Sequence, residues 1–329
     1  MDFAADRYER MQYRRCGRSG LYLPMISLGG WQAIGGYRDD DTSRRLFFTA
    51  FDQGITHFDF ANNYGRPPGA SEQLFGRILR DMPRDELLIS SKAGYRMWSG
   101  PYGDWGSRKY IIASCDASLK RLGVDYVDIF YHHRHDPDTP LEETMGALAS
   151  LVQQGKALYV GISNYHEPSL SAAVETMRRL SGPPLTIHQP CCNLLNRRAI
   201  DSVLPGAAAA GMGVICFSPL AQGLLTERYL DGIPGDSRAA DQAQGGLRER
   251  LTPAVLDGLR SLASLAADRG QSLAALALAW LLRDERVTSV LIGASRPEQI
   301  LANVAACRRI DFSADELARI DAVCAAMAL

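Results

Sequence analysis

The chain has 329 residues, of which 46% are apolar and 22% charged, a composition typical of a large globular protein. Its net charge of −1 gives no reason to expect nucleic acid or an anionic membrane as a partner. The seven cysteines show no metal-finger spacing, the N-terminus lacks a secretory signal, and no apolar run approaches the roughly 20 residues of a membrane helix, so we expect a cytoplasmic protein with reduced thiols.

Strand and helix patterns alternate along most of the chain. We expect a loose extension over residues 1–10, a hairpin over 13–25 with a Gly/Ser turn, and a short strand that ends at Gly29 and Gly30. Short apolar runs predict further strands at 57–61, 87–92, 127–133, 157–163, 185–189, 213–218 and 288–292. Helical periodicity and capping residues predict helices that begin at 40–42 and at 297, and others over 71–79, 107–122, 141–154, 168–180, 197–210, 253–269, 272–284 and 313–326.

Eight apolar strands, each followed by a helix, favour a single α/β domain over residues 1–329, folded as a closed (β/α)8 TIM barrel. A doubly wound open sheet is the alternative. The two long loops at 94–106 and 219–250 both follow strands. They therefore lie on the C-terminal face, where barrel active sites are found.

Polar side chains follow three of the predicted strands, at the points where these strands end. Asp59 lies near the end of one strand and Tyr64 in the loop just beyond it, Lys92 ends the next strand, and His132 and His133 end the third. Strand alternation sends the two histidines to opposite faces, and the residues alone do not say which one faces the mouth. We expect a carboxylate, a phenol, an ammonium and one imidazole to meet above the sheet.

A buried lysine needs a counter-ion, and Asp59 on the neighbouring strand can supply it to Lys92. A fixed positive charge beside Tyr64 predicts a tyrosine pKa below its usual value of about 10, so that the phenol could give up a proton near neutral pH. Asp59 as a plain turn carboxylate and Tyr64 as a core aromatic are the structural alternatives.

A phosphate site is predicted after the last strand. Ser295 and Arg296 follow Gly293 and precede a helix that begins near Pro297, where backbone N–H groups and a guanidinium can bind phosphate. The alternative is a plain helix cap at Ser295. The histidines lack metal-site spacing and the usual nucleotide and serine-hydrolase motifs are absent, so we predict no metal.

Several separate motifs, taken together, resemble the aldo-keto reductase family from about Tyr13 to the end of the chain. Within that family, the segments 97–110 and 187–197 are most similar to the bacterial L-glyceraldehyde 3-phosphate reductases, and more distantly to the voltage-gated potassium channel β subunits. The family motifs are 28–31 (LGGW), 58–65 (FDFANNYG), 161–164 (GISN), 217–224 (FSPLAQGL) and 292–299 (IGASRPEQ).

The resemblance implies a barrel whose N-terminal hairpin closes the bottom, with NADPH or NADP+ bound across the mouth. It implies a catalytic tetrad of Asp59, Tyr64, Lys92 and His133, with the carbonyl substrate against Trp31, Tyr64 and His133. The nicotinamide carboxamide would be held by Ser163, Asn164 and Gln189, and its ring would stack on Phe217. The pyrophosphate would be lined by Ser218, Leu220, Gln222 and Gly223. The 2′-phosphate would be bound by Ser295 and Arg296, and the adenine by Gln299 and Asn303. The other implied contacts of the cofactor site are Gly30, Trp31, Asp59, Pro219, Arg228, Arg238 and Gly293.

The resemblance leaves two functions open. One is an NADPH-dependent reductase of small aldehydes or ketones, such as glyceraldehyde 3-phosphate or methylglyoxal. The other is a regulatory subunit that senses redox state through bound NADPH, as the channel β subunits do. The complete tetrad favours catalysis, and the near relatives imply a homo-oligomer.

Overall fold

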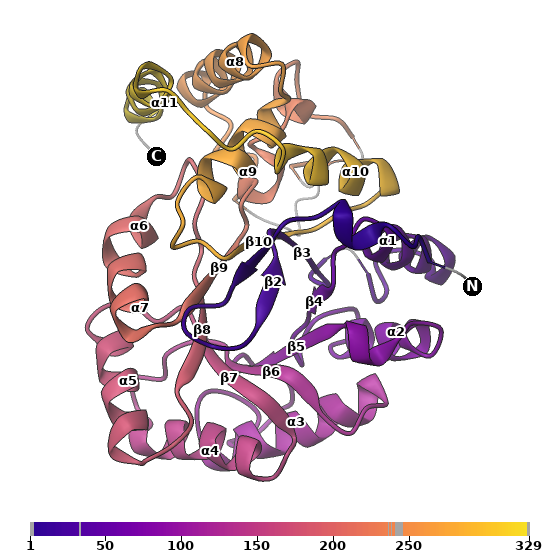
Figure 1. Ribbon diagram of the computed structural model, residues 1–329, viewed down its shortest axis with the longest axis vertical. Helices are drawn as coiled ribbons and strands as arrows, with labels where there is room; N and C mark the ends of the chain where they lie inside the picture. Colours follow the sequence, from indigo (N-terminus) through magenta and orange to yellow (C-terminus); the bar gives the residue numbers. More distant parts are fainter. Residues whose placement is uncertain (1–2, 33, 236, 238, 241–245, 328–329) are drawn as a thin grey trace.

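In the computed structural model, the described residues (3–32, 34–235, 237, 239–240 and 246–327) form a closed barrel of eight parallel strands surrounded by helices (Figure 1). The barrel closes because β10 pairs with β3 in parallel register, with Val290 opposite Ile26. This confirms the predicted (β/α)8 barrel and excludes the open sheet. The barrel strands are β3 (Ile26–Gly29), β4 (His57–Asp59), β5 (Leu88–Ala93), β6 (Val127–His132), β7 (Ala157–Ser163), β8 (Leu185–Gln189), β9 (Gly213–Phe217) and β10 (Ser289–Ile292).

The helices begin and end largely where capping residues predict. Ser107 caps α3 by accepting the Tyr110 N–H, and α3 ends before Gly123, which has the left-handed conformation that favours glycine. The helix predicted over 197–210 is two helices, because Pro205 cannot donate a hydrogen bond inside a continuous helix. The helices are α1 (Asp40–Asp52), α2 (Ala70–Leu79), α3 (Arg108–Leu122), α4 (Leu141–Gln153), α5 (Ser169–Arg179), α6 (Arg198–Ser202), α7 (Leu204–Ala210), α8 (Pro253–Asp268), α9 (Leu273–Leu282), α10 (Pro297–Ala306) and α11 (Ala314–Ala326).

The hairpin of β1 (Tyr13–Arg15) and β2 (Tyr22–Pro24) closes the bottom of the barrel, as predicted (Figure 1). Cys16 and Leu23 are fully buried. Their side chains complete the apolar layer inside the barrel, which also contains Ile129, Tyr131, Ile187 and Ile215.

The N-terminal residues from 3 to 10 are not the loose extension that we expected. The Phe3 ring packs edge-on against Phe48 and Phe51 of α1, at 5.2 and 4.8 Å between centroids. The Ala4 N–H donates to the Asp52 carboxylate at 2.8 Å. The segment is mostly polar, but its two aromatic side chains anchor it, since the Tyr8 hydroxyl also donates to Glu86.

Helix α9 is apolar on every side because it is enclosed by other elements. It packs against β10, α8 and α10, and α11 packs on α8 at the outer edge (Figure 1). Although it is only ten residues long, α9 is the most apolar of the helices that the structure describes. Among the described residues, no helix has both the length and the hydropathy to cross a membrane.

Candidate active site

The four predicted polar residues meet at one rim of the barrel. Asp59 ends β4, Lys92 lies near the end of β5, and His133 directly follows β6. β4, β5 and β6 are consecutive neighbours in the barrel, and parallel strands end at the same edge. Tyr64 lies in the loop that directly follows β4, so its ring lies at the same rim.

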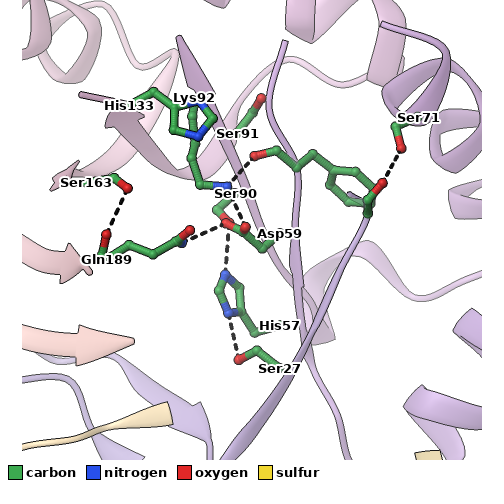
Figure 2. Close-up of polar contacts among 12 residues, drawn as sticks. Ser27, His57, Asp59, Ser71, Ser90, Ser91, Lys92, His133, Ser163 and Gln189 are labelled. Atoms are coloured by element: carbon green, nitrogen blue, oxygen red, sulfur yellow. Dashed lines mark hydrogen bonds and ion pairs between the residues drawn. The ribbon is translucent and has the colours of Figure 1, made fainter. Parts of the chain in front are cut away.

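Asp59 and Lys92 form a fully buried ion pair (Figure 2). The Lys92 ammonium donates to Asp59 Oδ2 and to the Phe60 carbonyl oxygen, the latter at 2.7 Å. Asp59 Oδ1 accepts from Ser90 Oγ at 2.6 Å and from Gln189 Nε2 at 3.3 Å. Burial lowers the pKa of Lys92, although the attraction of Asp59 opposes this shift. A charge pair buried this deeply needs such additional hydrogen bonds.

The Tyr64 ring lies beside both Lys92 and His133. Lys92 Nζ is 5.1 Å from its centroid, and the His133 ring packs edge-on against it at 5.9 Å. The predicted fall in the tyrosine pKa was wrong. Burial, followed by the charge of Asp59, raises the pKa of Tyr64 well above 10. The Lys92 ammonium, which is paired with Asp59, does not outweigh the cost of burying a phenolate, so the phenol keeps its proton.

His133, rather than His132, is the histidine that faces Tyr64. Among the described residues, His133 Nδ1 is buried without a hydrogen-bond partner. Burial and the nearby Lys92 charge keep the pKa of His133 well below 6.5, so the ring is a neutral imidazole. His132 points elsewhere, with its Nδ1 2.6 Å from the Tyr165 hydroxyl.

A stacked arginine supports this histidine, and the sequence did not single it out. The Arg134 guanidinium lies between the rings of Tyr95 and Trp105, at 4.4 and 3.5 Å from their centroids. It also donates to the Gly94 carbonyl oxygen at 2.7 Å and to Asp104 at 2.8 Å. Tyr95 in turn packs perpendicular to His133 at 4.7 Å. The only available signal was an arginine directly after the His-His pair, opposite an aromatic-rich loop.

Three further predicted residues adjoin the ion pair at the ends of β7 and β8. Ser163 Oγ donates to the Gln189 carbonyl oxygen at 2.8 Å (Figure 2). Asn164 donates to Ser163 Oγ at 3.2 Å and to the His133 carbonyl oxygen at 3.1 Å. The structure thus places three amide and hydroxyl side chains next to the four-residue cluster.

The loop after β9 has an unusual backbone. Ser218, Ala221 and Gln222 have positive φ angles of 52°, 48° and 61°, and Gly223 has a φ of 103°. Such angles cost free energy for residues other than glycine and tend to occur at functional sites. The Ser218 carbonyl oxygen is held by Asn193 Nδ2 at 2.9 Å. Phe217, Pro219 and Leu220 belong to the same loop.

The N-terminus of α10 is open to an anion. The cap residue is Arg296 rather than Ser295, and among the described residues no side chain caps it. The Ser295 N–H and hydroxyl instead donate to Gln299 Oε1, at 2.7 and 3.1 Å. A side chain at Gly293 would meet no atom within 4 Å. Free backbone donors and an exposed guanidinium form a set suited to phosphate.

The remaining predicted residues have mixed placements. Gly30 is tightly enclosed, since a Cβ atom there would lie 2.6 Å from the Phe60 ring. Trp31 is 40% exposed, Asn303 is buried in α10, and Arg228 is exposed. Arg238 lies outside the described residues. Within the described part of the chain, no group of side chains could hold a metal ion.

A closed parallel barrel with a buried Asp–Lys pair, a tyrosine and a histidine at its mouth defines a class of oxidoreductases. The chain belongs to the aldo/keto reductase family, whose model matches residues 25–325. It is 55% identical over 323 residues to L-glyceraldehyde 3-phosphate reductase of Escherichia coli strain K12, covering 96% of this chain and 93% of the relative.

More distant relatives are probable voltage-gated potassium channel β subunits. That of Oryza sativa is 36% identical over 95% of this chain and 96% of the relative. That of Arabidopsis thaliana is also 36% identical, over 90% of this chain and 91% of the relative.

Proposed function

We propose that the protein reduces small aldehydes, such as glyceraldehyde 3-phosphate or methylglyoxal, to alcohols with NADPH. The observation that carries the proposal is the neutral Tyr64 phenol beside His133 and above the Asp59–Lys92 pair. The name of the relative at 55% identity supports glyceraldehyde 3-phosphate as a substrate.

The four residues have complementary roles in this proposal. NADPH supplies the hydride when it is bound. Tyr64 donates a proton to the carbonyl oxygen, and His133, as a neutral imidazole, orients that oxygen. Loss of that proton leaves negative charge on the Tyr64 side chain. The Lys92 ammonium, 5.1 Å from the centroid of the Tyr64 ring, would stabilise this charge as it develops during the reaction. Asp59 holds Lys92 in place.

The cofactor would lie along the rim from β7 to α10. Ser163, Asn164 and Gln189 would hold the nicotinamide, and Phe217 would stack on it. The left-handed backbone of the loop after β9 and the open N-terminus of α10 fit the phosphates of a dinucleotide. The residues proposed for the pyrophosphate end are Ser218, Pro219, Leu220, Gln222, Gly223 and Arg228, and those for the adenosine end are Gly293, Ser295, Arg296, Gln299 and Asn303.

Steady-state kinetics with a small set of substrates tests this function. Glyceraldehyde, its 3-phosphate and methylglyoxal should each be reduced with NADPH, and more slowly with NADH because Arg296 favours a 2′-phosphate. An Arg296→Ala variant should lose most of the preference for NADPH while its turnover with NADH stays the same. The absence of turnover with all three aldehydes and both cofactors would rule out the proposal.

A redox-sensing regulatory subunit is the second candidate, because relatives with channel-subunit names cover nearly the whole chain. The complete polar cluster favours catalysis. Negligible turnover combined with tight binding of NADPH would instead favour this second function. We also propose that the protein is cytoplasmic, which is consistent with its seven free cysteines. We further propose a homo-oligomer, and light scattering would test the oligomeric state.

A further inference from the structure

A chain of hydrogen bonds runs through the barrel interior below the ion pair (Figure 2). His57 Nε2 lies 2.9 Å from Ser90 Oγ, and His57 Nδ1 lies 2.9 Å from Ser27 Oγ. Ser27 Oγ is 2.7 Å from Ser289 Oγ. These side chains are fully buried and come from four consecutive strands, β10, β3, β4 and β5. None of them has a role in the reaction described above.

The Asp59 carboxylate sets the direction of every bond in this chain. Its Oδ2 is paired with the Lys92 ammonium, and its Oδ1 accepts from the Ser90 hydroxyl, so the Ser90 proton points to Asp59. Ser90 Oγ can therefore only accept from His57, which requires the proton of the imidazole to be on Nε2.

The directions of the remaining hydrogen bonds follow from the charge of the His57 ring. Burial lowers the pKa of His57 to about 4, so the ring is neutral and carries a single N–H group. Nδ1 is then an acceptor, and Ser27 must donate to it. Ser289 in turn donates to Ser27. All the donors thus point toward Asp59, and hydrogen bonds aligned in this way strengthen one another.

We propose that His57 is a positioning residue of the reductase: as its Nε2–H tautomer, it commits the Ser90 hydroxyl to Asp59 and so keeps the Asp59–Lys92 pair charged and oriented. The role in turnover rests on the proposed function, whereas the tautomer does not. The titratable groups around this pair are Tyr64, Tyr131, His133 and Glu72, and Gln189 adds an amide donor to Asp59.

The tautomer can be observed directly in the wild-type protein. Histidine labelled with ¹⁵N, followed by NMR between pH 8 and pH 5.5, should show His57 neutral throughout, with Nε2 protonated and Nδ1 not. The His57→Gln variant assigns the signal by its loss. A proton on Nδ1, or titration of the ring within this range, would overturn the proposal whether or not the enzyme turns over.

Kinetics separates positioning from a purely structural role. The His57→Leu variant should lower kcat by roughly ten-fold or more, because the Ser90 hydroxyl is no longer held toward Asp59 by a donor on its far side. His57→Gln, which keeps an N–H group in reach of Ser90, should recover most of the lost kcat.

Ser289→Ala is the matched control, since it removes only the far end of the chain, and its kcat should change by less than about three-fold. A structural role would lower the melting temperature of His57→Leu but leave kcat of its folded fraction unchanged, and that result would refute the positioning role. An inactive wild-type protein would refute the proposed function while leaving the tautomer to be judged by NMR.

Discussion

At the scale of single residues, the sequence indicated which side chains meet but not their protonation. Asp59, Tyr64 and Lys92 could be placed together because they follow neighbouring strands. The pKa of Tyr64 could not be predicted, because it depends on burial and on the neutralisation of Lys92 by Asp59. The orientation of the two histidines likewise required coordinates, since both adjoin one strand end.

The buried ion pair gives a prediction about stability. Lys92→Met should lower the free energy of unfolding by about 3–5 kcal/mol, because it leaves the Asp59 carboxylate buried without its counter-ion. Urea denaturation measures the change. The double variant Asp59→Asn/Lys92→Met, which has no uncompensated charge, should be more stable than Lys92→Met alone. If the double variant were the less stable of the two, the pair would not be coupled as described.

At the scale of elements, strands and capped helices were predictable and the supporting contacts were not. The positions of the strands follow from continuous apolar runs, and α3 could be bounded by Ser107 and Gly123. Phe3 and Arg134 contact segments that are distant in the sequence or have no regular secondary structure. Such contacts could not be predicted, because these segments show no hydrophobic periodicity. The break between α6 and α7 was in principle visible as Pro205.

The loop over 94–106 should be sensitive to Arg134, which follows β6 and packs against this loop. Arg134→Met removes the stacked guanidinium and its bonds to Gly94 and Asp104, which frees Tyr95 from its position against His133. We expect kcat to fall roughly 10- to 100-fold, as misplaced catalytic groups cause. NADPH affinity should stay the same, because the proposed cofactor residues lie on the β7–β10 side.

Arg108 provides the control for this loop prediction. It is exposed at the start of α3, where it contacts Ser150 of α4. Arg108→Met should therefore leave turnover unchanged. Equal losses in the Arg108 and Arg134 variants would show that charge, and not the stacked geometry, is responsible.

The hairpin that closes the barrel makes a separate contribution to stability. Leu23→Ala should cost about 2–5 kcal/mol, since Leu23 is fully buried in the apolar layer inside the barrel. Its neighbour Tyr22 is 56% exposed, and Tyr22→Ala should cost less than about 0.5 kcal/mol. Chemical denaturation of both variants measures this difference. Similar small losses would mean that the hairpin is not packed into the barrel.

At the scale of the whole molecule, buried neutral histidines make the fold sensitive to acid. Burial lowers the pKa of His57 and His132 to about 4 and that of His188 to about 3. In the unfolded chain each ring binds a proton near pH 6.5, so acidification between pH 6.5 and pH 5 favours the unfolded state. Stability is therefore greatest above pH 6.5 with respect to these groups.

The slope of the free energy of unfolding against pH follows from the number of protons that the histidines take up on unfolding. With His133, whose pKa burial also lowers well below 6.5, four rings take up a proton on unfolding. They should lower the free energy of unfolding by on the order of 5 kcal/mol per pH unit near pH 5. Urea denaturation at intervals from pH 8 to pH 5 measures it, and the slope from these rings should vanish above pH 7. A flat profile down to pH 5 would show that the rings are not buried as neutral groups.

The central claim is that the Tyr64 phenol, held neutral at the barrel mouth, protonates the substrate during carbonyl reduction. The most direct test is a single-turnover experiment in which enzyme saturated with NADPH is mixed with glyceraldehyde 3-phosphate and the loss of NADPH absorbance is followed by stopped flow. Tyr64→Phe should bind NADPH as the wild type does but consume it about 10²- to 10⁴-fold more slowly. Equal rates in the two proteins would contradict the account.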